Sequence, residues 1–125
     1  MLSLIPKPNP KPADIKLLRS YSDASIAEIR RAAETGSSIR DFRIFEGDWE
    51  SERCVIVRLY REFACNDSVP FAICEDGEVF ETPQSLRDRL EGLRQIELQI
   101  QRDKDLEMGS IRTREEFKPH DDEWF

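Results

Sequence analysis

Apolar residues recur along most of this chain at spacings that predict a small set of helices and strands. The clearest helix begins after Ser25, because Ser25 and Glu28 form the Ser-x-x-Glu pattern in which each side chain satisfies a backbone amide of the other residue. Gly36 then supplies the left-handed residue that ends many helices. Between them, one side of the helix carries Ile26, Ile29, Ala32 and Ala33.

A longer helix is predicted after Thr82 and Pro83, an N-cap residue followed by a proline at the first helical position. Its apolar residues recur at steps of three and four: Leu86, Leu90, Leu93, Ile96 and Ile100. The helix should run to about Met108 and stop at Gly109, a length of roughly 40 Å at 1.5 Å per residue. Its apolar stripe belongs either to the core or to a contact with a second copy of the chain.

Four further segments predict strands. Residues 14–21 are predicted to be a short strand with Ile15 and Leu17 on one face, and residues 39–45 a second strand. Residues 71–75 and 78–81 flank Asp76-Gly77, a pair typical of a tight hairpin turn. Because these strands alternate with the helices, they are expected to form one small sheet.

Residues 50–65 fit both a strand and a helix. Val55-Ile-Val57 is rich in β-branched residues, which favours a strand. The apolar set of this segment nevertheless recurs at helical spacing and continues for two turns: Val55, Ile56, Leu59, Tyr60 and Phe63. We therefore favour a helix.

These elements predict an α+β fold in the order β-α-β-α-β-β-α: a single domain with one small mixed or antiparallel sheet covered by helices. The domain is expected to occupy residues 14–109. Residues 1–13 are expected to form a proline-rich N-terminal arm, because four prolines stand at alternate positions between residues 6 and 12. Residues 110–125 are predicted to be an acidic, aromatic tail, either extended or docked.

The charge of the chain is −7 and it is unevenly distributed. Residues 1–31 carry six Lys/Arg and three Asp/Glu, whereas the remainder carries thirteen against twenty-three. This acidity argues against direct binding of nucleic acid, which needs clustered basic residues. No apolar run approaches the roughly 18–20 residues that cross a bilayer, and the N-terminus lacks the apolar stretch of a signal peptide. We expect a cytoplasmic protein with no membrane contact.

Residues capable of catalysis or metal binding are few. Cys54, Cys65 and Cys74 are separated by eleven and nine positions and form no Cys-x-x-Cys pair, so reduced thiols are expected. The single histidine, His120, stands in a predicted tail, where side chains are seldom held tightly enough for catalysis. No glycine-rich phosphate cradle is present. We therefore predict no catalytic residue, no metal and no cofactor, and hence a protein that is not an enzyme.

Much of the excess acid gathers in three clusters beside aromatic residues, a combination that suits a basic partner. The predicted partner-binding residues are Glu46, Asp48, Trp49 and Glu50, then Asp76, Glu78 and Phe80, and in the tail Asp121, Asp122, Trp124 and Phe125. For Trp49 the alternative, that its ring caps the edge of the core, is equally open.

The order of elements in residues 14–60 also supports this view. A short strand precedes a Ser-Ile-Ala-Glu-Ile-Arg helix closed by Thr35-Gly36, and a strand ending Ile-Phe-Glu-Gly-Asp-Trp49 precedes another helix. This order resembles the small acidic immunity proteins that bacteria encode beside toxins, including those of contact-dependent growth inhibition systems. The resemblance implies a cytoplasmic protein that binds a cognate toxin domain and neutralises it. Such toxins are commonly nucleases with a basic substrate-binding face.

A second hypothesis from the sequence is a structural or regulatory protein that self-associates through its long C-terminal helix. The acid would then serve solubility alone. The sequence leaves open a monomer or a weak homodimer.

Overall fold

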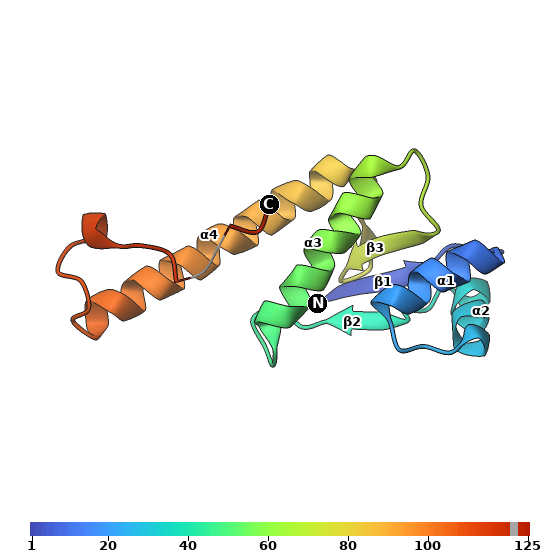
Figure 1. Ribbon diagram of the computed structural model, residues 1–125, viewed down its shortest axis with the longest axis horizontal. Helices are drawn as coiled ribbons and strands as arrows, with labels where there is room; N and C mark the ends of the chain where they lie inside the picture. Colours follow the sequence, from blue (N-terminus) through green and yellow to red (C-terminus); the bar gives the residue numbers. More distant parts are fainter. Residues whose placement is uncertain (121–122) are drawn as a thin grey trace. The chain divides into compact units, whose positions relative to one another are not determined.

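The computed structural model describes residues 1–120 and 123–125, and its fold is α+β, as predicted (Figure 1). Its contacts divide the chain into two compact units, Met1–Pro83 and Gln84–Phe125. The elements are β1 (Leu2–Pro6), α1 (Pro12–Tyr21), α2 (Ile26–Thr35), β2 (Arg40–Phe42), α3 (Trp49–Cys65), β3 (Phe71–Glu75), β4 (Glu78–Val79) and α4 (Pro83–Glu107), followed by a short 3-10 helix at Arg114–Glu116.

A four-stranded antiparallel sheet, in the order β2-β1-β3-β4, forms the centre of the first unit. β1 has a partner on both sides, since Leu4 pairs with Arg40 of β2 and with Ile73 of β3. Residues directly opposite each other in antiparallel strands share one face of the sheet. One face therefore collects the buried apolar residues Leu2, Leu4, Pro6, Phe42, Phe71 and Ile73.

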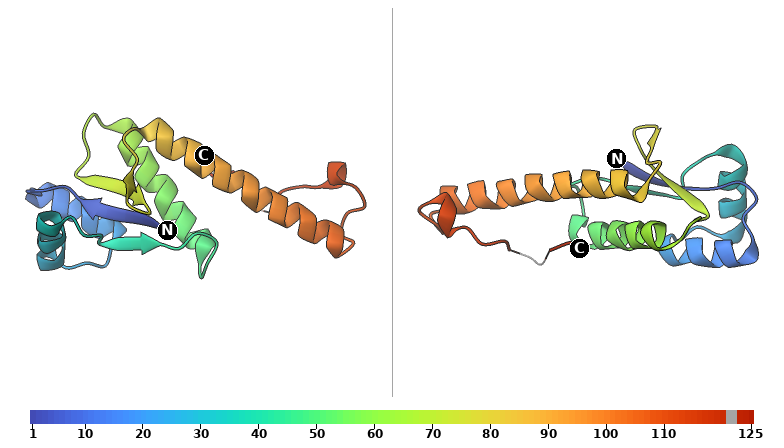
Figure 2. Two further views of the ribbon diagram at one scale, coloured as in Figure 1. Left: turned by 180° about the vertical axis from the view of Figure 1, so that it is seen from behind. Right: turned by 90° about the horizontal axis from the view of Figure 1, so that it is seen from above.

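Helices α1 and α3 lie on the same side of this sheet, and α2 packs against β1 and α1 (Figures 1 and 2). Arg40, which shares a face with Leu4, bonds to groups of both α1 and α3, so these helices cover the apolar face. Their own contributions to the core include Ile15, Leu18, Ile29, Ile56 and Leu59, each at most 5% exposed.

The prediction of a strand at residues 14–21 is wrong, because this segment belongs to helix α1. Pro12 stands in its first turn, and the Asp14 carboxylate accepts the Lys11 N–H at 2.9 Å. The buried residues of α1 are Ile15, Leu18 and Tyr21, a spacing of three that places them on one helical face. The observed order is therefore β-α-α-β-α-β-β-α rather than the predicted one.

The first strand lies instead in the proline-rich segment. β1 begins at Leu2, and its last residue, Pro6, pairs with Phe71 and is less than 2% exposed. The segment predicted as an N-terminal arm, residues 1–13, thus includes a strand of the sheet at its start. A proline interrupts the hydrogen-bond ladder least at the end of a strand, and the next residue, Lys7, already bonds to the Pro70 carbonyl at 2.9 Å.

The strongest local signals are confirmed. The Ser25 hydroxyl accepts the Glu28 N–H at 3.1 Å, and Gly36 ends α2 with φ of 70°. The ambiguous residues 50–65 are helical, as favoured. Asp76 and Gly77 form the hairpin turn, both with positive φ.

In the second unit, α4 agrees with its predicted extent, and the chain after it returns along the helix (Figure 2). The His120 N–H donates to Gln101 Oε1 at 3.1 Å, the Glu123 carboxylate lies 3.8 Å from Arg94, and the Phe125 ring lies 4.6 Å from the guanidinium of Arg87. Because the helix positions fall as the tail positions rise, the tail runs antiparallel to α4. Among the described residues no helix is both long and apolar enough to cross a membrane.

The central place of β1 can be tested with Leu4→Ala. Leu4 is 0% exposed, so its truncation should lower the free energy of unfolding by about 2–5 kcal/mol in chemical denaturation. Lys7→Ala, three residues along and exposed, should change it by no more than about 0.5 kcal/mol. Equal, small effects of both substitutions would contradict a structural role for the N-terminal segment.

Candidate functional site

The strand order brings two of the three acidic clusters to the same end of the sheet. β2 and β3 both run antiparallel to β1, and their C-terminal residues, Phe42 and Glu75, both pair with Leu2. Neighbouring strands lie about 4.8 Å apart, so the two chain exits are separated by about 10 Å. The acidic end, as we call it, comprises Glu46, Asp48 and Glu50 after β2 together with Glu75, Asp76 and Glu78 at the β3–β4 turn (Figure 1).

Two residues with positive φ shape the loop between β2 and α3. Gly47 adopts φ of 58° readily, whereas Phe45 at 60° is uncommon for a bulky residue. The Phe45 ring packs edge-on against Trp49, with 5.4 Å between ring centroids. Trp49 is 7% exposed and Phe45 is 37% exposed. Trp49 therefore packs in the core, as its alternative interpretation held, and Phe45 is the ring that solvent reaches beside the acids.

The N-terminus of helix α3 favours some of the carboxylates at this end of the sheet. Asp48 and Glu50 stand at the N-terminus of α3, where the helix dipole favours negative charge. Glu52, one turn along, is held by Arg40, which bonds to its carboxylate at 3.0 Å and to the Tyr21 carbonyl at 2.8 Å. Asp48 and Glu50 themselves are exposed, and the Asp48 side chain makes no capping hydrogen bond.

Positive charge at the acidic end is sparse and loosely placed. The Met1 ammonium lies 3.6 Å from Asp76, and Arg43 lies 3.9 Å from Glu46, both between exposed side chains. Such exposed ion pairs contribute little to the stability of the fold. Glu75 also stands directly opposite Glu78, so two carboxylates share one face of the β3–β4 hairpin.

The other predicted partner-binding residues do not belong to the exposed carboxylates of the acidic end. Phe80 is half-buried, and its N–H bonds to the Ile73 carbonyl at 2.9 Å. Trp124 is 6% exposed with its ring 5.9 Å from the Arg94 guanidinium, while Phe125 is 38% exposed. Asp121 and Asp122 lie outside the described residues. The acidic end thus unites the first two clusters, and the tail cluster belongs to the second unit.

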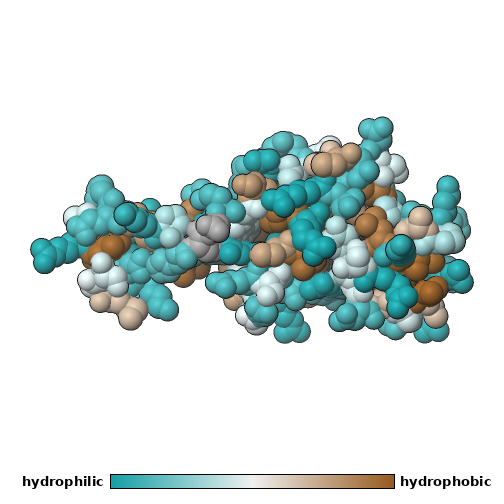
Figure 3. Space-filling model, viewed as in Figure 1, coloured by the Kyte–Doolittle hydropathy of each residue, from teal (hydrophilic) through white to brown (hydrophobic). Residues whose placement is uncertain are grey.

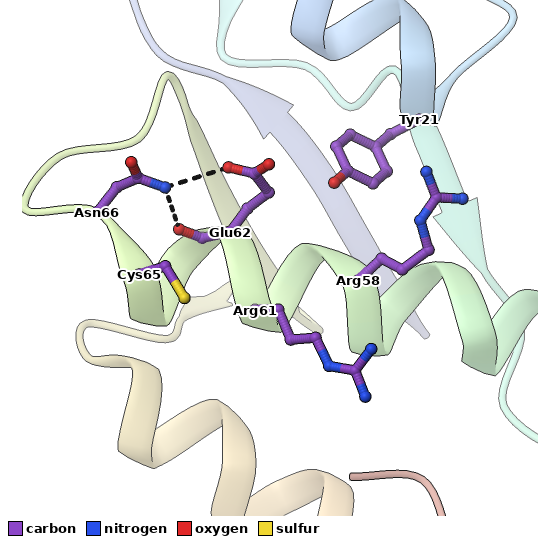
Figure 4. Close-up of a pocket in the computed structure, with 6 residues that line it drawn as sticks. All are labelled: Tyr21, Arg58, Arg61, Glu62, Cys65 and Asn66. Carbon is purple, nitrogen blue, oxygen red and sulfur yellow. Dashed lines mark hydrogen bonds between the residues drawn. The ribbon is translucent and has the colours of Figure 1, made fainter.

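A different kind of site lies elsewhere in the first unit. A pocket of about 410 Å³ between the C-terminal half of α3 and the end of α1 is lined by Tyr21, Arg58, Arg61, Glu62, Cys65 and Asn66 (Figure 4). Sequence reasoning missed it, because Tyr21 reaches it only through tertiary packing. The available signal was the spacing of Arg58, Arg61 and Cys65, which places them on one side of a helix.

The pocket fixes several of its polar groups. The Arg58 guanidinium lies 5.3 Å from the Tyr21 ring centroid, and the Asn66 amide donates to the Glu62 carbonyl at 2.7 Å and to its carboxylate at 3.1 Å. Burial raises the pKa of the Tyr21 hydroxyl above its usual value; the charge of Glu62 raises it further, and Arg58 opposes both.

The described residues contain no group of three or more His, Cys, Asp or Glu side chains arranged to hold a metal ion. His120 instead approaches Asp105, with its Nε2 at 2.8 Å from the carboxylate, and helps to dock the tail on α4.

No family model, curated protein or solved structure matches the chain. The resemblance to immunity proteins therefore rests on residues 14–60 alone. Its first element, a strand at residues 14–21, is a helix in the structure.

The raised pKa of Tyr21 predicts a loss of stability at alkaline pH. Because the folded state holds this proton more tightly, the stabilisation is complete below the unfolded pKa of about 10 and declines as pH rises through the folded pKa. Tyr21→Phe should therefore lose less unfolding free energy than the wild type as pH rises above about 10. Parallel curves for the two proteins, measured by denaturation at each pH, would contradict the assignment.

Proposed function

We propose that the protein is an immunity-type inhibitor, not an enzyme, and that its acidic end binds a basic face of a cognate bacterial toxin domain. The observation that supports this function is the convergence of two acidic clusters, far apart in sequence, on one end of the sheet. A nuclease domain is the favoured class of target, because the carboxylates would occupy positions that its active site offers to phosphates.

The chemistry of the acidic end suits a protein partner better than a nucleic acid. Six carboxylates on residues 46–50 and 75–78 repel phosphates and steer a basic surface toward them. Phe45 adds a partly exposed aromatic ring within the charged surface, the kind of side chain on which interface energy concentrates. On the face visible in Figure 3, hydrophobic residues form only small separate patches among hydrophilic ones, which is consistent with recognition through charge.

The cytoplasm is the proposed site of action, because an immunity protein protects the cell that makes it. In this proposal no metal or cofactor takes part, and the third cluster, with Asp121 and Asp122, adds to the negative charge of the chain.

The proposal is tested by reversing charge at the acidic end. Glu50→Arg with Glu78→Arg should weaken binding to the protein encoded immediately upstream by about tenfold or more, and the affinity that remains should fall less steeply with salt because fewer attractive charge pairs are left to screen. The matched control, Glu34→Arg with Asp67→Arg, makes the same change in net charge at exposed positions outside the acidic end. Affinities can be measured by calorimetry, and protection by co-expression with the upstream gene.

Two results would count against the proposal. No complex at moderate salt together with no protection on co-expression would exclude the immunity function for that partner. Equal loss of binding in both double variants would show that net charge alone, rather than the acidic end, governs the interaction.

The alternative function, self-association through α4, is favoured by one observation. Ile96 and Ile100, one helical turn apart, are 43% and 54% exposed. If they pack against a second copy, sedimentation should show a dimer at micromolar concentration that Ile100→Glu converts to a monomer. A wild-type monomer under the same conditions would exclude this alternative.

A further inference from the structure

Helix α3 presents a stripe of reactive and charged side chains that the proposed function does not use. Cys54, Arg58, Arg61 and Cys65 follow one another at steps of four, three and four, and all four are exposed. Steps of three and four place residues on one side of a helix. Of the two thiols only Cys65 lines the pocket beside Tyr21 (Figure 4).

We propose that this pocket is a modification site at which Cys65 forms a mixed disulfide with a small thiol that carries carboxylates and an amino group, with glutathione as the representative compound. The proposal is independent of the inhibitory function, because the acidic end lies at the opposite end of α3.

The first support is the accessibility of the thiol next to positive charge. Cys65 is the last residue of α3, and Arg61 precedes it by one turn, which places their Cβ atoms about 5–6 Å apart. Arg58 stands one further turn back, beside the Tyr21 ring, so both guanidinium groups line the pocket that Cys65 also lines (Figure 4). Guanidinium groups bind carboxylates with paired hydrogen bonds.

The second support is independent of the cysteine. Tyr21 is 5% exposed and lines the pocket, yet its hydroxyl forms no hydrogen bond within the part of the chain that the structure describes. The hydroxyl oxygen itself is not buried but reaches the open pocket. A carboxylate or peptide carbonyl bound there would accept its hydrogen bond.

The third support is the match of charge and size. The lining offers two guanidinium groups and one carboxylate, from Arg58, Arg61 and Glu62, and a glutathione moiety carries two carboxylates and one ammonium group. The pocket volume of about 410 Å³ is within the range of roughly 300–1,000 Å³ typical of small-molecule sites.

The reaction is an ordinary thiol–disulfide exchange. The Cys65 thiolate attacks one sulfur of glutathione disulfide, the disulfide bond of glutathione breaks, and a new bond joins Cys65 to one glutathione. The other glutathione leaves as a thiolate and takes up a proton. Cys65 is oxidised, and the released glutathione is the reduced product.

The three cysteines of the chain provide internal controls. The reduced full-length protein is treated with glutathione disulfide, and labelling at each cysteine is followed by peptide mass spectrometry. Each exposed thiol has one arginine a helical turn away, but only Cys65 lines the pocket that holds a second guanidinium group. Cys65 should therefore react at least about fivefold faster than Cys54, the rate ratio expected from one additional partly exposed ion pair. Cys74 is buried, and burial raises the pKa of its thiol, so it should react most slowly. With hydroxyethyl disulfide, which carries no charge, Cys65 and Cys54 should react at similar rates.

Variants separate recognition from thiol reactivity. Arg61→Gln should slow glutathionylation of Cys65 by about fivefold and leave Cys54 unchanged. Tyr21→Phe should slow the same reaction without altering the rate with hydroxyethyl disulfide. Arg31→Gln, an exposed arginine outside the pocket, should have no effect. Equal rates at Cys65 and Cys54, or equal slowing of both disulfides by Arg61→Gln, would overturn the proposal.

Discussion

The pairing of β1 with strands on both of its sides holds the first unit together. β1 supplies the hydrogen bonds that join β2 to β3, and its buried residues Leu2, Leu4 and Pro6 face the side that α1 and α3 cover. Without this strand, β2 has no partner in the sheet and β3 keeps only the short β4. The same pairing fixes where the chain leaves β2 and β3, so the position of the acidic loops is a consequence of the core.

Local signals in the sequence were enough to predict most of the helices. The Ser25 and Glu28 capping pair, Gly36, the Asp76-Gly77 turn and the Thr82-Pro83 start all describe interactions between residues a few positions apart. Such interactions are readable from the sequence because no distant residue is needed to complete them.

The predictions that failed concern segments whose structure depends on contacts between residues far apart in the sequence. Ile15 and Leu17 suggested a strand, but Leu18 and Tyr21 are the residues that the core buries together with Ile15. The prolines after Ile5 concealed a strand that is stable because it has two neighbours. The meeting of the two acidic clusters, and of Tyr21 with Arg58, depends on strand order and helix packing, which no local pattern specifies. The acid clusters themselves were visible, but their placement was not.

The separation in sequence between β1 and its partners bears on how the protein folds. α1 and α2 can form from local interactions, whereas Leu4 must wait for Ile73 to be synthesised before the central ladder can close. Closing so long a loop is entropically costly, and folds dominated by distant contacts form slowly. The acidic surface therefore does not exist on a nascent or partly folded chain, so its appearance would report that the sheet is complete.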